Sequence, residues 1–232
     1  MTTIDLSIAI QHTPDHADRR TWVQSMLKQL RAENPAVQVE VVEDKKREGS
    51  WPTYLRTLKA ASGSSHHLML NDDLTLCKDF VASVREVARA RPNNLISLYT
   101  NSPVVFRARR RRESWIENTG VEGAAVIWPT PLIAEFIKWQ SIHVASDFPF
   151  EDIRVSMWLI KTSKPAFATV PSLAQHLGYQ SSLLGLNSAS KVAAWYVGDS
   201  RSALGIDWRQ GLRSPARDVM HFQLEWWRSF HP

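Results

Sequence analysis

Three side chains at one predicted strand end have the types and spacing to hold a cation. Asn71, Asp72 and Asp73 come directly after the apolar strand predicted at 67–70. Two adjacent carboxylates repel each other unless a cation or hydrogen-bond donors compensate their charge. A hard divalent ion, which takes oxygen ligands and keeps positions open for a diphosphate, would compensate it. The same tripeptide is also typical of an ordinary polar turn.

Two further groups later in the chain have chemically useful side chains. Glu151 and Asp152 begin a predicted helix after the turn DFPF, where the helix N-terminus favours an ionised carboxylate that can take a proton from a hydroxyl. His176 lies in the segment VPSLAQHLG, and a neutral imidazole can ligate a metal or hydrogen-bond a phosphate. Each group also has an ordinary reading, as an acidic first helical turn and as a loop histidine that binds nothing.

The elements that must position these groups alternate between strand and helix. Strand periodicity or apolar runs occur at 4–10, 37–41, 67–70, 95–99, 123–128 and 166–170, and helical spacing occurs between them at 18–34, 50–58, from 78, from 130 and from 151. This order predicts an α/β fold with a single mostly parallel central sheet flanked by helices. Ligands of open α/β sheets collect at the carboxyl ends of strands, which is where Asn71, Asp72 and Asp73 are expected.

Two regions give no clear pattern. Residues 100–120 are rich in arginine without a period, and the chain after residue 180 suggests only helical or irregular structure. We predict a catalytic domain at 1–190 and a C-terminal extension at 191–232 that packs back onto it through Trp226, Trp227 and Phe230.

The composition indicates a basic globular protein. The formal net charge is +5 with a sequence pI near 9.5, ten residues are tryptophan, and five of the six residues from 107 to 112 are arginine: Arg107, Arg109, Arg110, Arg111 and Arg112. Basic charge with aromatic faces suits an anionic, flat or sugar-like partner, although a protein can also be basic without such a partner.

The same sequence excludes several function classes. One cysteine, Cys77, excludes an internal disulfide and a zinc site with two thiolates from this chain, and we expect a buried structural thiol. Neither G-x-G-x-x-G after the first strand nor G-x-x-x-x-G-K-[ST] occurs. The first residues do not resemble a signal peptide and no stretch of 18 apolar residues occurs, so a cytoplasmic protein is expected.

The order of the motifs resembles a known enzyme family. The runs HHLMLNDDLTLCKDF, FPFEDIRVSMWL and VPSLAQHLGYQSSLLG look like a short, single-domain glycosyltransferase of the GT-A fold, over residues 4–186. The resemblance implies a Rossmann-related fold whose DXD motif binds Mn²⁺ or Mg²⁺ and a nucleotide sugar, expected to be a UDP-sugar. The chain resembles in particular the small bacterial or bacteriophage enzymes of this family, whose acceptors include cell-surface saccharides and modified bases in DNA.

The resemblance assigns roles to individual residues. It implies Asp73 and His176 as metal ligands, with Asn71 in a position where the family often has Asp and Asp72 as a contact to ribose or metal. It places Gln11 and His12 beside the nucleotide, and Trp51 and Arg56 at uracil and phosphate contacts. It implies Asp152, with Glu151 beside it, as the base that deprotonates the acceptor hydroxyl. The hydroxyl oxygen would then attack the anomeric carbon from the face opposite the diphosphate and invert its configuration, whereas a retaining enzyme would not need this base.

The acceptor and two other function classes stay open. The acceptor is a saccharide or lipid-linked glycan, or a hydroxylated base in DNA whose phosphates meet the Arg107–Arg112 segment. A metal-dependent nuclease would also need clustered carboxylates, with more acidic ligands than this chain obviously provides. A non-catalytic nucleic-acid-binding protein would explain the charge and the tryptophans, but it leaves the acidic strand end and His176 without a role.

Overall fold

Helices and strands alternate along the chain in the computed structural model, which describes residues 3–15, 17–61, 63–177 and 191–218. The helices are α1 (Ala17–Glu33), α2 (Ser50–Lys59), α3 (Phe80–Ala90), α4 (Val104–Arg110), α5 (Thr130–His143) and α6 (Glu151–Lys161). The strands are β1 (Leu6–His12), β2 (Gln38–Glu43), β3 (His66–Asn71), β4 (Leu74–Leu76), β5 (Leu95–Ser97), β6 (Trp115–Asn118), β7 (Ala125–Pro129), β8 (Ala166–Thr169), β9 (Ala174–His176) and β10 (Ala216–Asp218).

Eight strands form one central sheet in the order β10-β6-β8-β5-β7-β3-β1-β2. The β1/β2, β1/β3, β5/β8 and β6/β10 pairs are parallel, and β7 runs antiparallel to both of its neighbours, β3 and β5. The β6/β8 pair is also antiparallel. The predicted α/β class with a mostly parallel central sheet flanked by helices is therefore confirmed.

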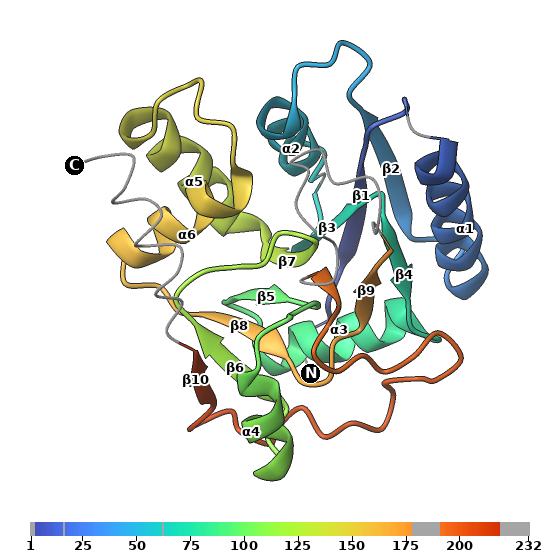
Figure 1. Ribbon diagram of the computed structural model, residues 1–232, viewed down its shortest axis with the longest axis vertical. Coiled ribbons are helices and arrows are strands. Elements are labelled where there is room, and N and C mark those ends of the chain that lie inside the picture. The colour runs from blue at the N-terminus through green and yellow to red at the C-terminus, as the bar shows by residue number, and fades with distance from the viewer. Residues whose placement is uncertain (1–2, 16, 62, 178–190, 219–232) are drawn as a thin grey trace.

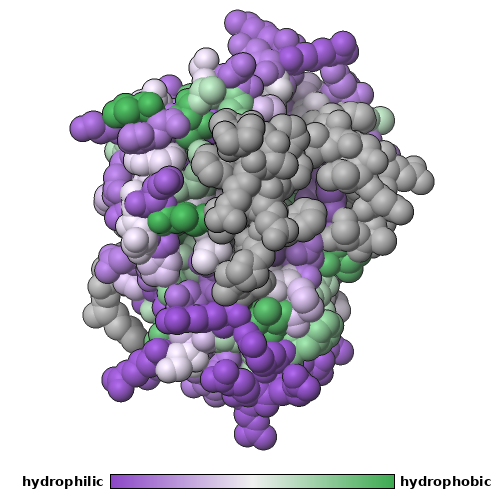
Figure 2. All heavy atoms as spheres, turned by 60° about the vertical axis from the view of Figure 1, so that its left-hand side comes forward, coloured by the Kyte–Doolittle hydropathy of each residue, from purple (hydrophilic) through white to green (hydrophobic). Residues whose placement is uncertain are grey.

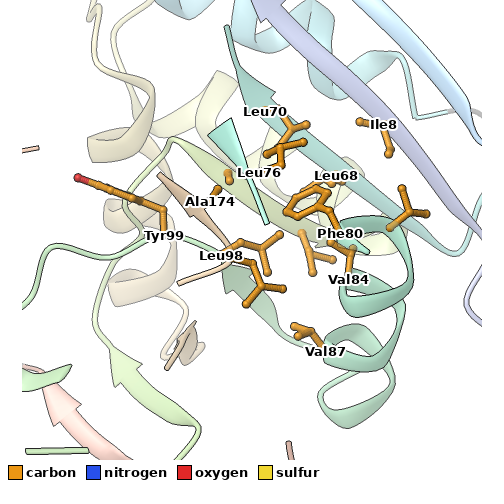
Figure 3. Close-up of a cluster of buried hydrophobic side chains, with 14 of the residues drawn as sticks. Ile8, Leu68, Leu70, Leu76, Phe80, Val84, Val87, Leu98, Tyr99 and Ala174 are labelled. Carbon is orange, nitrogen blue, oxygen red and sulfur yellow. The ribbon is translucent and has the colours of Figure 1, made fainter. Parts of the chain in front are cut away.

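Successive side chains of the central strands point to opposite faces of the sheet, so the core has two layers. Ile8 and Leu68 face α1 and α3, where they pack with Phe80 and the valines that follow it in α3 (Figure 3). Met69, one position on from Leu68, faces the opposite side and packs with Trp128 in the cluster that also contains residues of α2, α5 and α6 (Figure 1). Apolar side chains thus cover both faces of the central sheet, because these strands are buried on both sides.

Five elements were not predicted from the sequence, and one of them is β10, a strand in the C-terminal region where helical or irregular structure was expected. α4 and β6 lie in the arginine-rich region, where Val105 and Ala108 are the buried residues of a seven-residue helix. β4 and β9 have three residues each and form a separate antiparallel pair, in which Leu74 is the partner of His176. Elements this short bury at most three side chains each, which is too few for a periodic signal.

The described part of the C-terminal segment packs on the main core. Ala193, Ala203 and Trp208 belong to the same buried cluster as β1 and α3, and Trp115 Nε1 donates a hydrogen bond of 2.7 Å to the Trp208 carbonyl. The expected packing of Trp226, Trp227 and Phe230 lies outside the described residues, and the domain boundary at 190 stays a prediction. No helix in the described ranges is both long and apolar enough to cross a membrane.

Candidate functional site

Asp72 forms hydrogen bonds that link β1, β3 and α1 at the carboxyl edge of the sheet. Its Oδ2 accepts a 2.7 Å hydrogen bond from the backbone N–H of Thr13 and lies 2.9 Å from Nδ1 of His12, at the end of β1. Its Oδ1 accepts a hydrogen bond from Arg19 of α1. Asp72 is only 1% exposed, so both of its oxygens are used inside the protein. It joins the ends of β1 and β3 to the start of α1.

Asp73 has a different set of contacts and keeps one oxygen open. Its Oδ2 lies 3.3 Å from Arg19 and 3.3 Å from Nδ1 of His176. Its Oδ1 is buried and has no hydrogen-bond partner among the described residues. Leaving such an oxygen without a partner costs free energy, so a buried orphan oxygen at a strand end indicates a missing cation or donor.

The short β4/β9 pair brings His176 to Asp73. Leu74, the residue after Asp73, pairs with His176, and the N–H of Leu177 donates a 2.7 Å hydrogen bond to the Asp73 carbonyl. Burial lowers the pKa of His176, against the opposing charge of Asp73. The ring is therefore neutral near pH 7 and offers a nitrogen lone pair as a ligand.

Asp73 and His176 fit a divalent cation that also binds a substrate. Mg²⁺ is commonly held by one or two carboxylates together with substrate phosphates, and a neutral imidazole nitrogen can serve as a further metal ligand. Within the described residues, no group of three or more His, Cys, Asp or Glu side chains is arranged to hold a metal alone. The donor set therefore suits a cation whose other ligands come from a diphosphate and water.

Glu151 is connected to the carboxyl end of β1 by a chain of hydrogen bonds. Ser50, the first residue of α2, donates its hydroxyl to Oε2 of Glu151. The carbonyl of Ser50 in turn accepts a 3.0 Å hydrogen bond from Nε2 of Gln11. Gln11 is the register partner of Asn71, so these contacts connect the start of α6 to the ends of β1 and β3.

Asp152 also lies at this edge of the sheet, where it packs against the segment before β7. A Cβ added at Gly123 would lie 3.5 Å from the Cβ of Asp152, so Asp152 packs closely against the backbone before β7. The next residue, Ala124, accepts a 2.8 Å hydrogen bond from the N–H of Asn71. The two predicted acidic groups, although about 80 residues apart in sequence, lie at one end of the sheet.

Burial raises the pKa values of both residues of the acidic pair. Burial, and then the charge of Asp152, raise the pKa of Glu151 to about 7. Burial also raises the pKa of Asp152, and the positive charge of Lys191 opposes that rise. The same lysine lowers the pKa of His176, so its charge acts on both the acidic pair and the proposed metal ligand.

The remaining predicted residues divide into two groups by their surroundings. Arg56 pairs with Glu48 and lies 4.0 Å from Asp44, at the carboxyl end of β2, so it stays beside the expected nucleotide position. Trp51 is only 6% exposed, with the guanidinium of Arg154 4.2 Å above its ring. A ring covered in this way is part of the core, and stacking on uracil would require the side chain to move.

Four residues of the site were missed by the sequence analysis: Arg19, Ser50, Tyr99 and Lys191. Arg19 has no local signal that separates it from Arg20, which points instead to the Pro14 carbonyl. Tyr99 places its ring 5.6 Å from the ring of His176 and donates its hydroxyl to the Lys191 carbonyl. These contacts join residues from separate elements, which periodicity within one element does not reveal.

Replacing Arg19 tests whether its guanidinium holds the acidic strand end together. We expect Arg19→Met to lower the free energy of unfolding at pH 7 by about 3–5 kcal/mol, because it leaves buried carboxylates without their cation. Arg19→Lys, which keeps the charge, should cost clearly less. Urea unfolding measures both variants, and a loss below about 1 kcal/mol in Arg19→Met would contradict this role.

The raised pKa of Glu151 predicts a pH-dependent stability. The folded state holds the Glu151 proton more tightly than the unfolded state, so the protonated carboxyl stabilises the protein fully below about pH 4.5. That contribution is lost as the pH rises through about 7. The difference in unfolding free energy between the unmodified protein and Glu151→Gln should therefore change between these pH values, by no more than about 3 kcal/mol. A difference that is independent of pH in urea titrations would refute it.

Comparisons with known proteins give only distant likenesses. No protein-family model and no curated protein matches the chain. A solved glycosyltransferase involved in the glycosylation of the major capsid of PBCV-1 has 10% identity and a TM-score of 0.36, over 68% of this chain and 78% of that one. The apo-form glycosyltransferase GlyE of Streptococcus pneumoniae TIGR4 has 10% identity and a TM-score of 0.40, over 70% of this chain. The match spans 44% of GlyE. Both structural neighbours are glycosyltransferases, at a level of similarity on which we base no functional argument.

Proposed function

We propose that the protein is a metal-dependent glycosyltransferase of GT-A type that moves a sugar from a nucleoside-diphosphate sugar, expected to be a UDP-sugar, to an acceptor hydroxyl. The observation that carries this proposal is the open Oδ1 of Asp73, buried beside His176 and Arg19 at the carboxyl edge of the sheet. This arrangement leaves one anionic position for a cation and surrounds it with groups that attract a diphosphate.

The donor would lie across the ends of β1 and β3. Asp73 and His176 would hold Mn²⁺ or Mg²⁺, which when bound offsets the negative charge of the leaving diphosphate. Arg19 and Lys191 add two positive charges around the same position. Gln11, whose Oε1 is buried without a partner among the described residues, would contact the nucleotide together with its register partner on β3.

The acidic pair would serve the acceptor. In the proposed step, Asp152 takes the proton of the acceptor hydroxyl, whose oxygen forms the new bond to the anomeric carbon. The bond from that carbon to the diphosphate oxygen breaks, and its electron pair leaves with the nucleoside diphosphate. Attack from the opposite face inverts the anomeric carbon. Glu151, held by Ser50, supports the base and keeps a proton close by near pH 7.

The other function classes make different demands on this site. A two-metal nuclease would need a second cation position beside Asp73, and Asp72 has both of its oxygens bonded inside the protein. A purely binding protein would have no use for an orphan carboxylate oxygen next to a neutral imidazole. Both classes nevertheless give distinct outcomes in the experiments below.

Asp73→Asn tests the donor site. We expect the unmodified protein to be stabilised against heat by UDP-sugars with Mn²⁺, and to hydrolyse one of them slowly in a donor screen. Asp73→Asn should lose the stabilisation and at least about 100-fold of the hydrolysis, since the amide binds a hard cation poorly. Asp5→Asn, an exposed carboxylate at the other end of β1, is the matched control and should change neither property.

The same screen separates the competing functions. If no sugar nucleotide stabilises the unmodified protein, and Asp73→Asn behaves identically, the glycosyltransferase proposal is wrong. Cleavage of DNA strands with Mg²⁺, lost in Asp73→Asn, would identify a nuclease instead.

Asp152→Asn tests the base. It should abolish transfer to acceptor while leaving the affinity for donor and cation unchanged, because the amide keeps the size of the side chain and removes its basicity. Glu151→Gln is the paired variant and should lower transfer by a smaller factor. Turnover like that of the unmodified protein in Asp152→Asn, or a greater loss in Glu151→Gln, would remove the base role from Asp152.

A further inference from the structure

A second site lies away from the acidic edge, where four arginines line an open pocket of about 750 Å³. Two segments form its walls, 111–113 before β6 and 209–214 before β10. The arginines are Arg111, Arg112, Arg209 and Arg213. This volume is within the usual range for binding small ligands, and it exceeds what a single small anion would fill.

The backbone of this pocket is firmly held. Ser114 donates its N–H to the Gln210 carbonyl at 3.2 Å and its hydroxyl to the Asp207 carbonyl at 2.9 Å, and its own carbonyl accepts a 3.0 Å hydrogen bond from the N–H of Val170. Below the pocket, Arg91 donates to the Leu212 carbonyl at 3.0 Å and stacks on Trp115. The wall segments therefore keep a fixed shape.

The pocket has an excess of positive charge. Glu113 is the one carboxylate in its lining, and it forms a 2.7 Å ion pair with Arg111. The side chains of Arg112, Arg209 and Arg213 form no ion pair within the described ranges, which leaves an excess of three positive charges. A guanidinium presents paired N–H donors that match the oxygens of a phosphate group.

The positive surface continues from the pocket along α4. This helix carries Arg107, Arg109 and Arg110, and the ring of Phe106 is 52% exposed among them. The guanidinium of Arg109 lies 4.7 Å above the ring of Trp195. Figure 2 shows hydrophilic side chains over the lower end of the molecule, the end at which Figure 1 places α4. A positively charged surface with an exposed aromatic ring, here that of Phe106, suits the backbone and bases of a single-stranded nucleic acid.

The wall of the pocket formed by residues 111–113 leads into β6 at the same edge of the sheet as the acidic site. Trp115, the first residue of β6, pairs with Thr169 at the carboxyl end of β8, and β8 runs parallel to β5. The order β6-β8-β5-β7-β3 places the pocket four strand spacings from the acidic strand end, about 19 Å at the usual spacing between strands. That distance is a few nucleotides of an extended strand.

We propose that this pocket and the arginines of α4 bind the phosphodiester backbone of a single-stranded nucleic acid, so that an unstacked base reaches the acidic site. The inference rests on the proposed function for the reaction, and it names the acceptor class as a hydroxyl-bearing base in a polynucleotide. A lipid-linked saccharide offers two phosphates at most, fewer than these arginines can pair with.

The test measures binding of a fluorescently labelled single-stranded DNA of about 15 nucleotides by anisotropy, from about 50 to about 200 mM salt. The variant Arg112→Gln/Arg209→Gln/Arg213→Gln should weaken binding about 10-fold or more. It should also reduce the slope of log K against log salt by about 2, since each lost phosphate contact in a single strand removes about 0.7. The matched control is Lys28→Gln/Arg31→Gln/Arg89→Gln, which removes the same charge from exposed positions on α1 and α3 and should change affinity less than about 2-fold.

Three outcomes would overturn the inference. The first is no binding of the oligonucleotide at about 50 mM salt, and the second is an equal loss in both triple variants. The third is arginine-dependent binding to vesicles that contain anionic phospholipid without binding to the oligonucleotide. Donor hydrolysis by the unmodified protein is measured separately. Its absence would refute the proposed function, whereas the anisotropy result reports on the pocket alone.

Discussion

The shared guanidinium of Arg19 is the contact on which the acidic strand end depends. Asp72 and Asp73 are adjacent and almost fully buried, so their charges would be costly without a cation inside the protein. Arg19 pairs with one oxygen of each carboxylate. The second oxygen of Asp72 contacts His12 and the N–H of Thr13, so both oxygens of Asp72 are bonded. The fold can therefore form before any metal binds and still keep one oxygen of Asp73 open. This division separates a fully bonded carboxylate from one that keeps an oxygen available, within one dipeptide.

The sequence predicted the scaffold better than the contacts within the site. Period-two strands and amphipathic helices are repeated local signals, and the elements from 6 to 71 lie where those signals placed them. The approach of His176 to Asp73 depends on the β4/β9 pair, which is too short to have a pattern and joins segments about 100 residues apart. Arg19 and Lys191 act through space from other elements, so their types alone could not distinguish them. Trp51 shows the same limit, since its residue type did not reveal that its ring is buried in the core.

The burial of Trp51 has a physical reason that also concerns the acidic pair. Arg154, fully buried one turn into α6, donates to the carbonyls of Ala145 and Phe148 and to the side chain of Gln140. Burial lowers its pKa to about 10, so it stays charged at neutral pH and needs these acceptors together with the face of Trp51. The loop 145–150, whose carbonyls Arg154 contacts, leads directly into Glu151 and Asp152. Trp51 therefore contributes to the site by stabilising the arginine that fixes the approach to the acidic pair.

The described C-terminal segment connects the two sites along the sheet edge. Its Ala194 donates a 3.0 Å hydrogen bond to the Thr100 carbonyl after β5, and its Trp195 carbonyl accepts one of 2.8 Å from the N–H of Ser172 after β8. Lys191 at one end of this segment acts on the acidic site, and Trp195, four residues on, lies under Arg109 of the basic surface. A segment held at both points by backbone hydrogen bonds can fix the spacing between the proposed donor site and the proposed acceptor surface. Transfer over a fixed distance needs such rigidity, because the attacking hydroxyl must approach the anomeric carbon to within about 3–3.5 Å.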